Sequence, residues 1–121
     1  MQYMPSEIAA IRDAAAVALR PAFDYSHANT VEQYLDAVEQ DRAQLWRAGD
    51  AWAITEVCRL KQGTGIHIVA LAGKFTMDLM RDIETWGKSK GCTRSYFSGR
   101  KGWIRRLPDY ALASVTCAKD L

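Results

Sequence analysis

The chain has 121 residues, of which 49% are hydrophobic and 25% charged, and its formal net charge is +2. This length suits one domain covering residues 1–121, and the composition excludes a disordered chain. The small net charge gives no general reason to expect nucleic-acid binding, so an electrostatic argument must come from how the charges are distributed.

Two further features of the composition bear on the compartment. The three cysteines, Cys58, Cys92 and Cys117, are scattered and lack the paired close spacing of a zinc site. We therefore expect reduced thiols, buried as small hydrophobic residues in an intracellular protein. No segment resembles a secretion signal or a membrane span of roughly 20 apolar residues, so no membrane association is expected.

The first third of the chain predicts two amphipathic helices. Pro5-Ser6-Glu7 marks a helix start, and apolar residues then recur at three- and four-residue steps until Pro21. After a loop from Phe23 to Asn29, Thr30-Val31-Glu32-Gln33 has the form of a capping box. The inward face of the second helix is then Tyr34, Leu35, Ala37 and Val38.

The middle of the chain predicts an antiparallel sheet, because the apolar period changes to two. The first strand is Gln44 to Arg47, and the turn Ala48-Gly49-Asp50 leads into a strand that carries Trp52, Ile54 and Glu56. Lys61-Gln62-Gly63-Thr64-Gly65 is a second turn. The largely apolar run Ile66 to Leu71 is typical of a central strand that is covered on both faces.

The remainder returns to helical spacing from Phe75 to Lys90, with Gly91 as C-cap and a strand from Cys92 to Phe97. GRKGWIRRL predicts a short helix before Pro108, and Leu112 to Cys117 a final strand. The fold class is α/β of the α+β kind: two helices, a mixed but mostly antiparallel sheet, a long helix, a strand, a short helix and a C-terminal strand. The expected core is Trp52, Ile54, Ile68, Val69, Leu71, Leu79, Ile83 and Trp86.

This order resembles the GNAT acyltransferase fold. The segments AQLWRAGDAWAITEV, GCTRSYFSGRKGWIRRLPDY and ASVTCAKDL are similar to small GNAT-like proteins of tailed phages and prophages, including the internal virion protein of short-tailed phages. The resemblance implies a GNAT-like fold, other phage proteins as partners, self-association, and residence in the bacterial host cytoplasm or in the virion. It implies a fold more strongly than an activity.

In the enzymes of this family, acyl-CoA pyrophosphate lies where the central strand enters the long helix, on backbone N–H groups of a glycine-rich loop. The corresponding stretch, Leu71 to Met77, has one glycine and the bulky Phe75 and Met77. If acetyl-CoA binds, the contacting residues are Leu71, Gly73, Phe75 and Thr76. The degenerate loop favours a protein without a cofactor, in which Gly73 only ends the strand.

Catalytic groups are sparse. The family commonly uses a strand carboxylate as base and a tyrosine of the last helix as acid, but the last helix predicted here has no tyrosine, and Tyr110 follows Pro108. Glu56 is the candidate base, because burial would raise its pKa. A strand carboxylate that faces solvent or pairs with an arginine is, however, the more common role of such a residue. His67 is the other candidate, or a hydrogen-bonded core residue. No second catalytic group lies at a telling spacing from either.

A basic end is the largest electrostatic feature, since residues 88–106 contain seven lysines and arginines and no acid. Within it, the candidate partner-binding residues are Arg100, Lys101, Trp103, Arg105 and Arg106. Arginines beside a tryptophan can hold phosphates and stack a base of a nucleic acid, or can pair with acidic groups of a protein. A solvated helix face with Trp103 in the core explains the same residues.

Two functional hypotheses follow. The first is a non-enzymatic phage virion or assembly protein that keeps the fold as a scaffold and binds protein or nucleic acid through the basic end. The alternative is an acyl-CoA-dependent N-acyltransferase with a degenerate pyrophosphate loop, acting on a protein or a small amine.

Overall fold

The computed structural model describes residues 1–23, 29–73 and 77–97. Its elements, in chain order, are a 3-10 turn η1 (Pro5–Glu7), helices α1 (Ile8–Phe23) and α2 (Val31–Glu39), strands β1 (Gln44–Ala48), β2 (Ala51–Leu60) and β3 (Gly63–Ala72), helix α3 (Met77–Ser89) and strand β4 (Arg94–Tyr96). The predicted order of elements is confirmed up to and including the strand expected from Cys92 to Phe97, which is β4. The predicted short helix and final strand lie outside the described residues.

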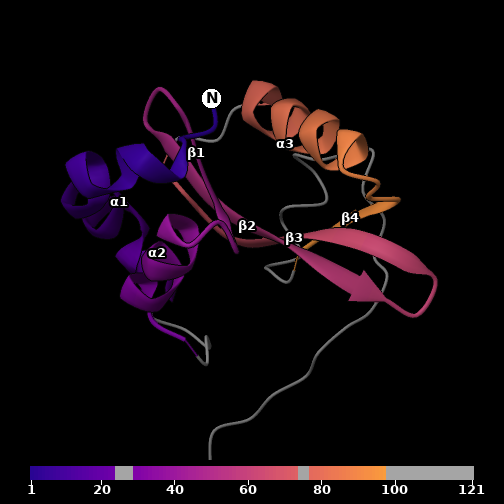
Figure 1. The fold of residues 1–121 in the computed structure, drawn as a ribbon. Helices are drawn as coiled ribbons and strands as arrows, with labels where there is room; N and C mark the ends of the chain where they lie inside the picture. The colour runs from indigo at the N-terminus through magenta and orange to yellow at the C-terminus, as the bar shows by residue number, and fades with distance from the viewer. Residues whose placement is uncertain (24–28, 74–76, 98–121) are drawn as a thin grey trace, which may run out of the picture.

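The four strands form one sheet in the order β1-β2-β3-β4. The first two pairings are antiparallel, and β4 pairs with β3 in parallel, as expected for a mixed but mostly antiparallel sheet. α1 and α2 cover one face of this sheet and α3 lies on the other (Figure 1). The central strands are therefore buried on both sides.

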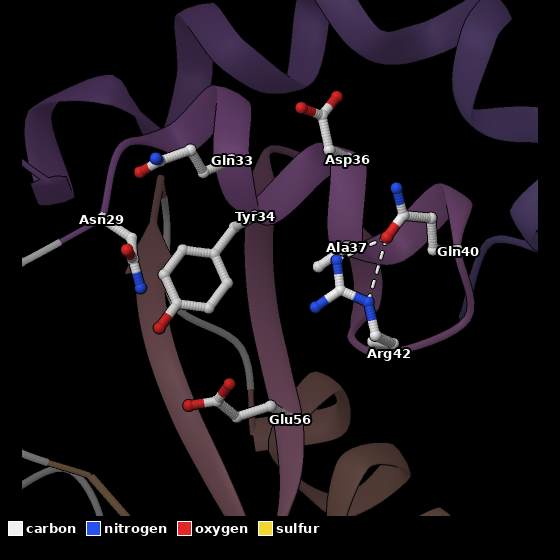
Figure 2. Close-up of a pocket in the computed structure, with 8 residues that line it drawn as sticks. All are labelled: Asn29, Gln33, Tyr34, Asp36, Ala37, Gln40, Arg42 and Glu56. Carbon is white, nitrogen blue, oxygen red and sulfur yellow. Dashed lines mark hydrogen bonds between the residues drawn. The ribbon is translucent and has the colours of Figure 1, made fainter.

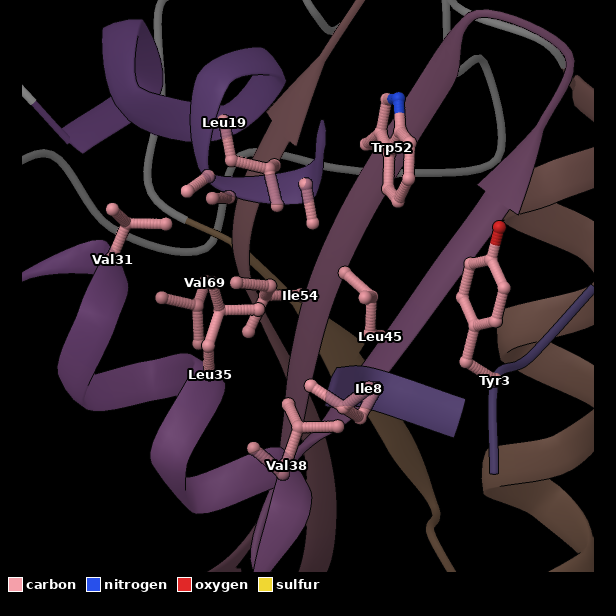
Figure 3. Close-up of a cluster of buried hydrophobic side chains, with 14 residues drawn as sticks. Tyr3, Ile8, Leu19, Val31, Leu35, Val38, Leu45, Trp52, Ile54 and Val69 are labelled. Atoms are coloured by element: carbon pink, nitrogen blue, oxygen red, sulfur yellow. The ribbon is translucent and has the colours of Figure 1, made fainter. Parts of the chain in front are cut away.

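The face beneath α1 and α2, called here the α1–α2 face, has the larger apolar cluster (Figure 3). Leu19 and Leu35 reach it from the helices, while Leu45, Ile54 and Val69 come from β1, β2 and β3. Four of these side chains have no exposed surface: Leu19, Leu35, Leu45 and Ile54. This packing holds both helices against the same strip of the sheet.

The opposite face, called here the α3 face, is buried under the long helix. Leu79, Met80 and Ile83 of α3 pack with Ile66 and Ile68 of β3. The sequence predicted this helix face correctly. Two residues of the predicted core, Leu71 and Trp86, are only partly buried and pack at the margin of this cluster, because they lie at the ends of β3 and α3.

A polar chain also crosses the α3 face. Trp46 donates its indole N–H to Thr55 Oγ1 at 2.9 Å, and Thr55 donates in turn to Gln44 Oε1 at 2.9 Å. Thr55 is completely buried. Each of these polar groups is satisfied, which lets them lie inside an otherwise apolar layer.

The register of β2 and β3 changes once. Ile54 pairs with Ala70, but Thr55 pairs with Ile68, so β3 has one extra residue, Val69, at this point. Both Val69 and Ala70 pack into the α1–α2 cluster as a result. On the α1–α2 face, this β-bulge divides the hairpin into an inner half that is core and an outer half that carries partly buried polar residues. On the opposite face, Ile66 and Ile68 of the outer half stay buried under α3.

The outer edge of β1 is covered by the first residues of the chain. Gln2 forms a bridge with Trp46, and the Tyr3 amide donates to the Leu45 carbonyl at 2.9 Å. Tyr3 is buried and its ring stacks on Trp52 at 6.0 Å between centroids. An edge strand is thereby protected from pairing with other chains.

Helix ends follow the sequence signals with one exception. The capping box at Thr30 forms, with the Thr30 amide donating to Gln33 Oε1 and the Gln33 amide to Thr30 Oγ1. Gly91 has φ +86° and completes the predicted C-cap of α3. The predicted stop at Pro21 is wrong, since α1 continues to Phe23. The carbonyl that Pro21 leaves without a helical donor is that of Val17, a residue on the exposed side, where water can replace the bond.

Candidate functional site

Polar side chains gather on the α1–α2 face beyond the bulge. Alternation along β2 places Glu56 and Cys58 on the same face as Trp52 and Ile54. His67 is the cross-strand partner of Glu56, and Tyr96 of β4 is the partner of His67. Three neighbouring strands thus bring a carboxylate, a thiol, an imidazole and a phenol together.

Glu56 and His67 are hydrogen-bonded to each other. The distance from His67 Nδ1 to Glu56 Oε1 is 3.0 Å, and the two side chains are 26% and 28% exposed, His67 the less so. Both are reachable from solvent while being held in place. The two candidate bases, which have no telling spacing in the sequence, are therefore partners in space, and within the described residues the partner found for Glu56 is His67.

The His67 ring is also held from its other side. Tyr96 stacks on it with centroids 4.9 Å apart and planes inclined by 12°. Gly65 leaves room for this ring, because a Cβ there would lie 3.1 Å from Tyr96 Cε1 and 2.7 Å from Leu60 Cδ1. Burial, a hydrogen bond with Cys58 and the negative charges of Cys58 and Glu56 raise the pKa of Tyr96 to about 12. Tyr96 is therefore a neutral donor at physiological pH.

A pocket of about 390 Å³ lies between α2 and this part of the sheet (Figure 2). Its lining is polar except for one alanine: Asn29, Gln33, Tyr34, Asp36, Ala37, Gln40, Arg42 and Glu56. Tyr34 projects from α2 with its hydroxyl toward the Glu56 side, and burial followed by the charge of Glu56 raises the pKa of Tyr34. The Glu56–His67 pair thus borders a cavity large enough for a small molecule.

Ion pairs hold the α2 wall of this pocket. Arg12 of α1 contacts Asp36 at 2.7 Å and Glu39 at 3.4 Å, and it also donates to the Glu32 carbonyl. Arg42 donates to Gln40 Oε1. The Asp36 carboxylate and the Gln40 oxygen are therefore already engaged by arginines, and Glu56 on the sheet side is the other carboxylate of the lining.

The junction of β3 with α3 was the predicted cofactor loop. Leu71 and Met77 are partly buried and pack toward the α3 face. Phe75 and Thr76 lie outside the described residues.

Gly73 of this junction has φ +85°, which a side chain would strain. A Cβ would also lie 1.9 Å from the Asp50 carbonyl oxygen in the β1–β2 turn. β3 ends at Ala72, so Gly73 does follow a strand terminus as predicted. Its glycine identity is explained by this close approach, without any ligand.

The described part of the basic end consists of Lys88, Lys90 and Arg94, all exposed. The Lys90 ammonium lies over Trp86, 5.8 Å from the ring centroid. The candidate partner-binding residues Arg100, Lys101, Trp103, Arg105 and Arg106 lie outside the described residues. A partner surface at this end stays a prediction.

Comparisons with known proteins identify the architecture. The fold matches an aminoglycoside acetyltransferase, HMB0005, from an uncultured soil metagenomic sample, with TM-score 0.70, 12% identity, and coverage of 100% of this chain and 95% of that one. It also matches a probable acetyltransferase, with TM-score 0.66, 5% identity, and coverage of 100% and 94%. The chain has the GNAT fold.

A third match is the aminoglycoside N-acetyltransferase AAC(6')-Iy in complex with CoA, with TM-score 0.58, 12% identity, and coverage of 99% of this chain and 89% of that one. No family model and no curated protein sequence matches the chain. At these identities the GNAT matches show the fold alone. They give no support to the predicted phage virion protein or to a protein without a cofactor.

In the described part of the chain, no helix is long and apolar enough to cross a membrane.

Proposed function

We propose that this protein is an acyl-CoA-dependent N-acyltransferase that acts on a small amine. The observation that carries the proposal is the hydrogen-bonded pair of Glu56 and His67 at a polar pocket of about 390 Å³ in a GNAT fold. This reverses the order of the two hypotheses drawn from the sequence.

The pocket supports an amine as acceptor. Asp36 and Glu56 supply carboxylates and Asn29 an amide oxygen, while the side-chain oxygens of Gln33 and Gln40 already accept from the Thr30 amide and from Arg42. Such acceptors bind ammonium and hydroxyl donors and disfavour anions. Asp36 is already paired with Arg12 at 2.7 Å, so Glu56 is the lining carboxylate that we assign to the amine.

Acyl-CoA supplies the activated acyl group as a thioester. As the amine nitrogen forms its bond to the acyl carbon and the C–S bond breaks, the nitrogen must lose a proton. Glu56 lines the pocket and can accept that proton directly or through a water molecule, because its carboxylate is half-buried and held by one hydrogen bond. His67 positions Glu56 and shares the proton through the same bond.

The GNAT fold implies that the junction of β3 with α3 holds the CoA pyrophosphate. Of the described residues there, Leu71 and Met77 pack toward the α3 face, and Gly73 has no side chain. The backbone N–H groups of Gly73 and of the first turn of α3 would hold the phosphates.

Thermal melting with and without acetyl-CoA tests the donor half of the proposal. At a hundredfold excess over the dissociation constant, binding stabilises the folded state by about 2.7 kcal/mol and raises the melting temperature. An unchanged melting temperature at millimolar acetyl-CoA contradicts the proposal.

Release of free CoA thiol, measured with an aminosugar, a polyamine and a simple alkylamine, tests the acceptor half. Glu56→Gln should lower turnover by about 10²–10⁴-fold while keeping the stabilisation by acetyl-CoA. The matched control is Glu84→Gln, a carboxylate of α3 on the opposite face, which should leave turnover unchanged. Equal turnover in both variants would remove Glu56 from the mechanism.

A further inference from the structure

Three potential metal ligands meet beside the pocket. One ligand atom each from Glu56, Cys58 and His67 lie within 4.8 Å of one another, and all three side chains are partly buried. No sequence signal points to this cluster, because the three cysteines lack any paired spacing. The strand register alone brings the carboxylate, the thiol and the imidazole together.

We infer that Glu56, Cys58 and His67 form a three-ligand site for a thiophilic divalent cation such as Zn²⁺. Glu56 and Cys58 are two residues apart on β2, so they point to the same face, and His67 reaches that face from the adjacent strand. Two ligands at i and i+2 with a third across the ladder surround one point above the sheet.

The distances are close to those of a bound ion. Tetrahedral Zn²⁺ with bonds of about 2.0–2.3 Å places neighbouring ligand atoms roughly 3.3–3.8 Å apart. The Glu56 and His67 atoms are already 3.0 Å apart, and the outer limit for the cluster is 4.8 Å. Rotations of side chains can close this difference, because Glu56 and Cys58 are only partly buried.

The charge and softness of the ligands select the class of ion. A thiolate and a carboxylate carry two negative charges, which a divalent cation neutralises. Thiolate and imidazole ligands favour Zn²⁺ and its transition-metal neighbours over Mg²⁺ or Ca²⁺, which prefer oxygen. Three protein ligands also leave one coordination position for water or for a ligand in the pocket.

Neighbouring residues hold the ligands in place. Tyr96 stacks on the His67 ring and is hydrogen-bonded to Cys58, so one residue orients two of the three ligands. Contacts of this kind, to the ligands and not to the ion, fix ligand geometry in metal sites. Glu56 and His67 serve both this site and the proposed acyl transfer, so a bound ion would compete with the amine for them.

The first experiment is a titration of the untagged, metal-free protein with Co²⁺, followed by absorption spectroscopy. Tetrahedral coordination with a thiolate gives a sulfur-to-cobalt band in the near ultraviolet and intense visible bands. We expect both, with one Co²⁺ per chain, displaced by Zn²⁺ and not by Mg²⁺. Absence of the sulfur band at millimolar Co²⁺ overturns the inference.

The variants assign the ligands. Cys58→Ser should abolish the sulfur band, and Glu56→Gln and His67→Ala should each weaken binding by at least about tenfold. The matched controls are His27→Ala, which changes the other histidine, and the double variant Cys92→Ala/Cys117→Ala, which leaves Cys58 as the only thiol. A sulfur band that persists in Cys58→Ser, or that is absent from a folded double variant, overturns the inference.

The metal-site inference and the proposed acyl transfer are tested by separate measurements, so one can be wrong while the other holds. The Co²⁺ spectrum is recorded without acyl-CoA or amine, so it does not depend on the proposed function. Should Cys58→Ser fail to fold, the double variant still decides, because any sulfur band in it must come from Cys58. If the double variant is also unfolded, loss of Co²⁺ affinity in Glu56→Gln decides instead.

Discussion

The inner and outer halves of the β2–β3 hairpin differ sharply, although one continuous ladder joins them. On the inner side of the bulge, Ile54 and Val69 are buried under α1 and α2. On the outer side, the same face of the sheet carries Glu56 and His67, each about one-quarter exposed. The sheet therefore supports the core at one end and presents a polar site at the other, and the bulge marks the boundary.

The largest expected effect comes from placing a charge in the inner half. Val69→Asp would force an unpaired carboxylate into a site that is 7% exposed, so the variant should not fold under native conditions. Circular dichroism and thermal melting measure this. Val57→Asp is the matched control in the outer half, where the valine is 39% exposed and the variant should fold. Similar melting temperatures for the two variants would contradict the difference in burial between the inner and outer halves.

A second effect concerns two glycines with positive φ. Gly73→Ala should cost at least about 2 kcal/mol, because the new Cβ would strain a φ of +85° and collide with the Asp50 carbonyl. Gly49→Ala adds a Cβ at φ +59° with nothing within 4 Å, so only about 1 kcal/mol is expected. Urea denaturation of the two variants compares them. Equal losses of unfolding free energy in the two variants would mean that the backbone near Asp50 moves away from the new Cβ at no cost in stability.

A third effect separates buried polar groups from the half-exposed site. Thr55→Val removes the link between Trp46 and Gln44 inside the α3 face, which should cost about 1–3 kcal/mol. Glu56→Gln, the next residue along the strand, should change stability by less than about 1 kcal/mol because water reaches it. The free energy of unfolding from urea titration tests both. A larger loss for Glu56→Gln would identify the Glu56–His67 pair as a structural element.

The smallest effect lies on the helical surface, far from either half. A hydrogen bond from Arg20, 2.7 Å away, lowers the pKa of Glu32. Stability from this pair is present above the ordinary carboxyl pKa and lost as pH falls through the lowered value. Both groups are exposed, so Arg20→Ala should leave the melting temperature nearly unchanged while the pKa of Glu32, followed by NMR, rises toward its ordinary value. An unshifted pKa would contradict the pairing.

The elements of this fold could be predicted because each has a local signal. The capping box at Thr30, the glycine at position 91 and the apolar period of α3 depend on residues a few positions apart. Leu71 and Trp86 were placed too deep, since periodicity gives the face of an element and not how far its ends extend beyond the core.

Glu56 and His67 were both candidates from the sequence, but their pairing was not predicted because it depends on the length of one turn. A turn over residues 61–65 was expected, whereas β3 begins at Gly63 and only Lys61 and Gln62 connect the strands. Counting outward from Leu60 and Gly63 makes Glu56 the partner of His67. Placing the turn correctly would have paired the two candidates, but the bulge at Val69 and the position of Tyr96 depend on tertiary packing and have no sequence signal.

The covered edge of β1 has a consequence for the order of folding. Tyr3 can dock only after β1 and β2 have paired, because its partners Leu45 and Trp52 lie on different strands. The closure spans about forty residues of chain, which is slow relative to forming the local hairpins. We expect the first residues to join the native structure late and to detach early. Amide hydrogen exchange at Tyr3 should then be faster than at Ile54, even though both residues are buried. Such a difference would mean that the first residues can detach from the edge of β1 while the sheet stays folded.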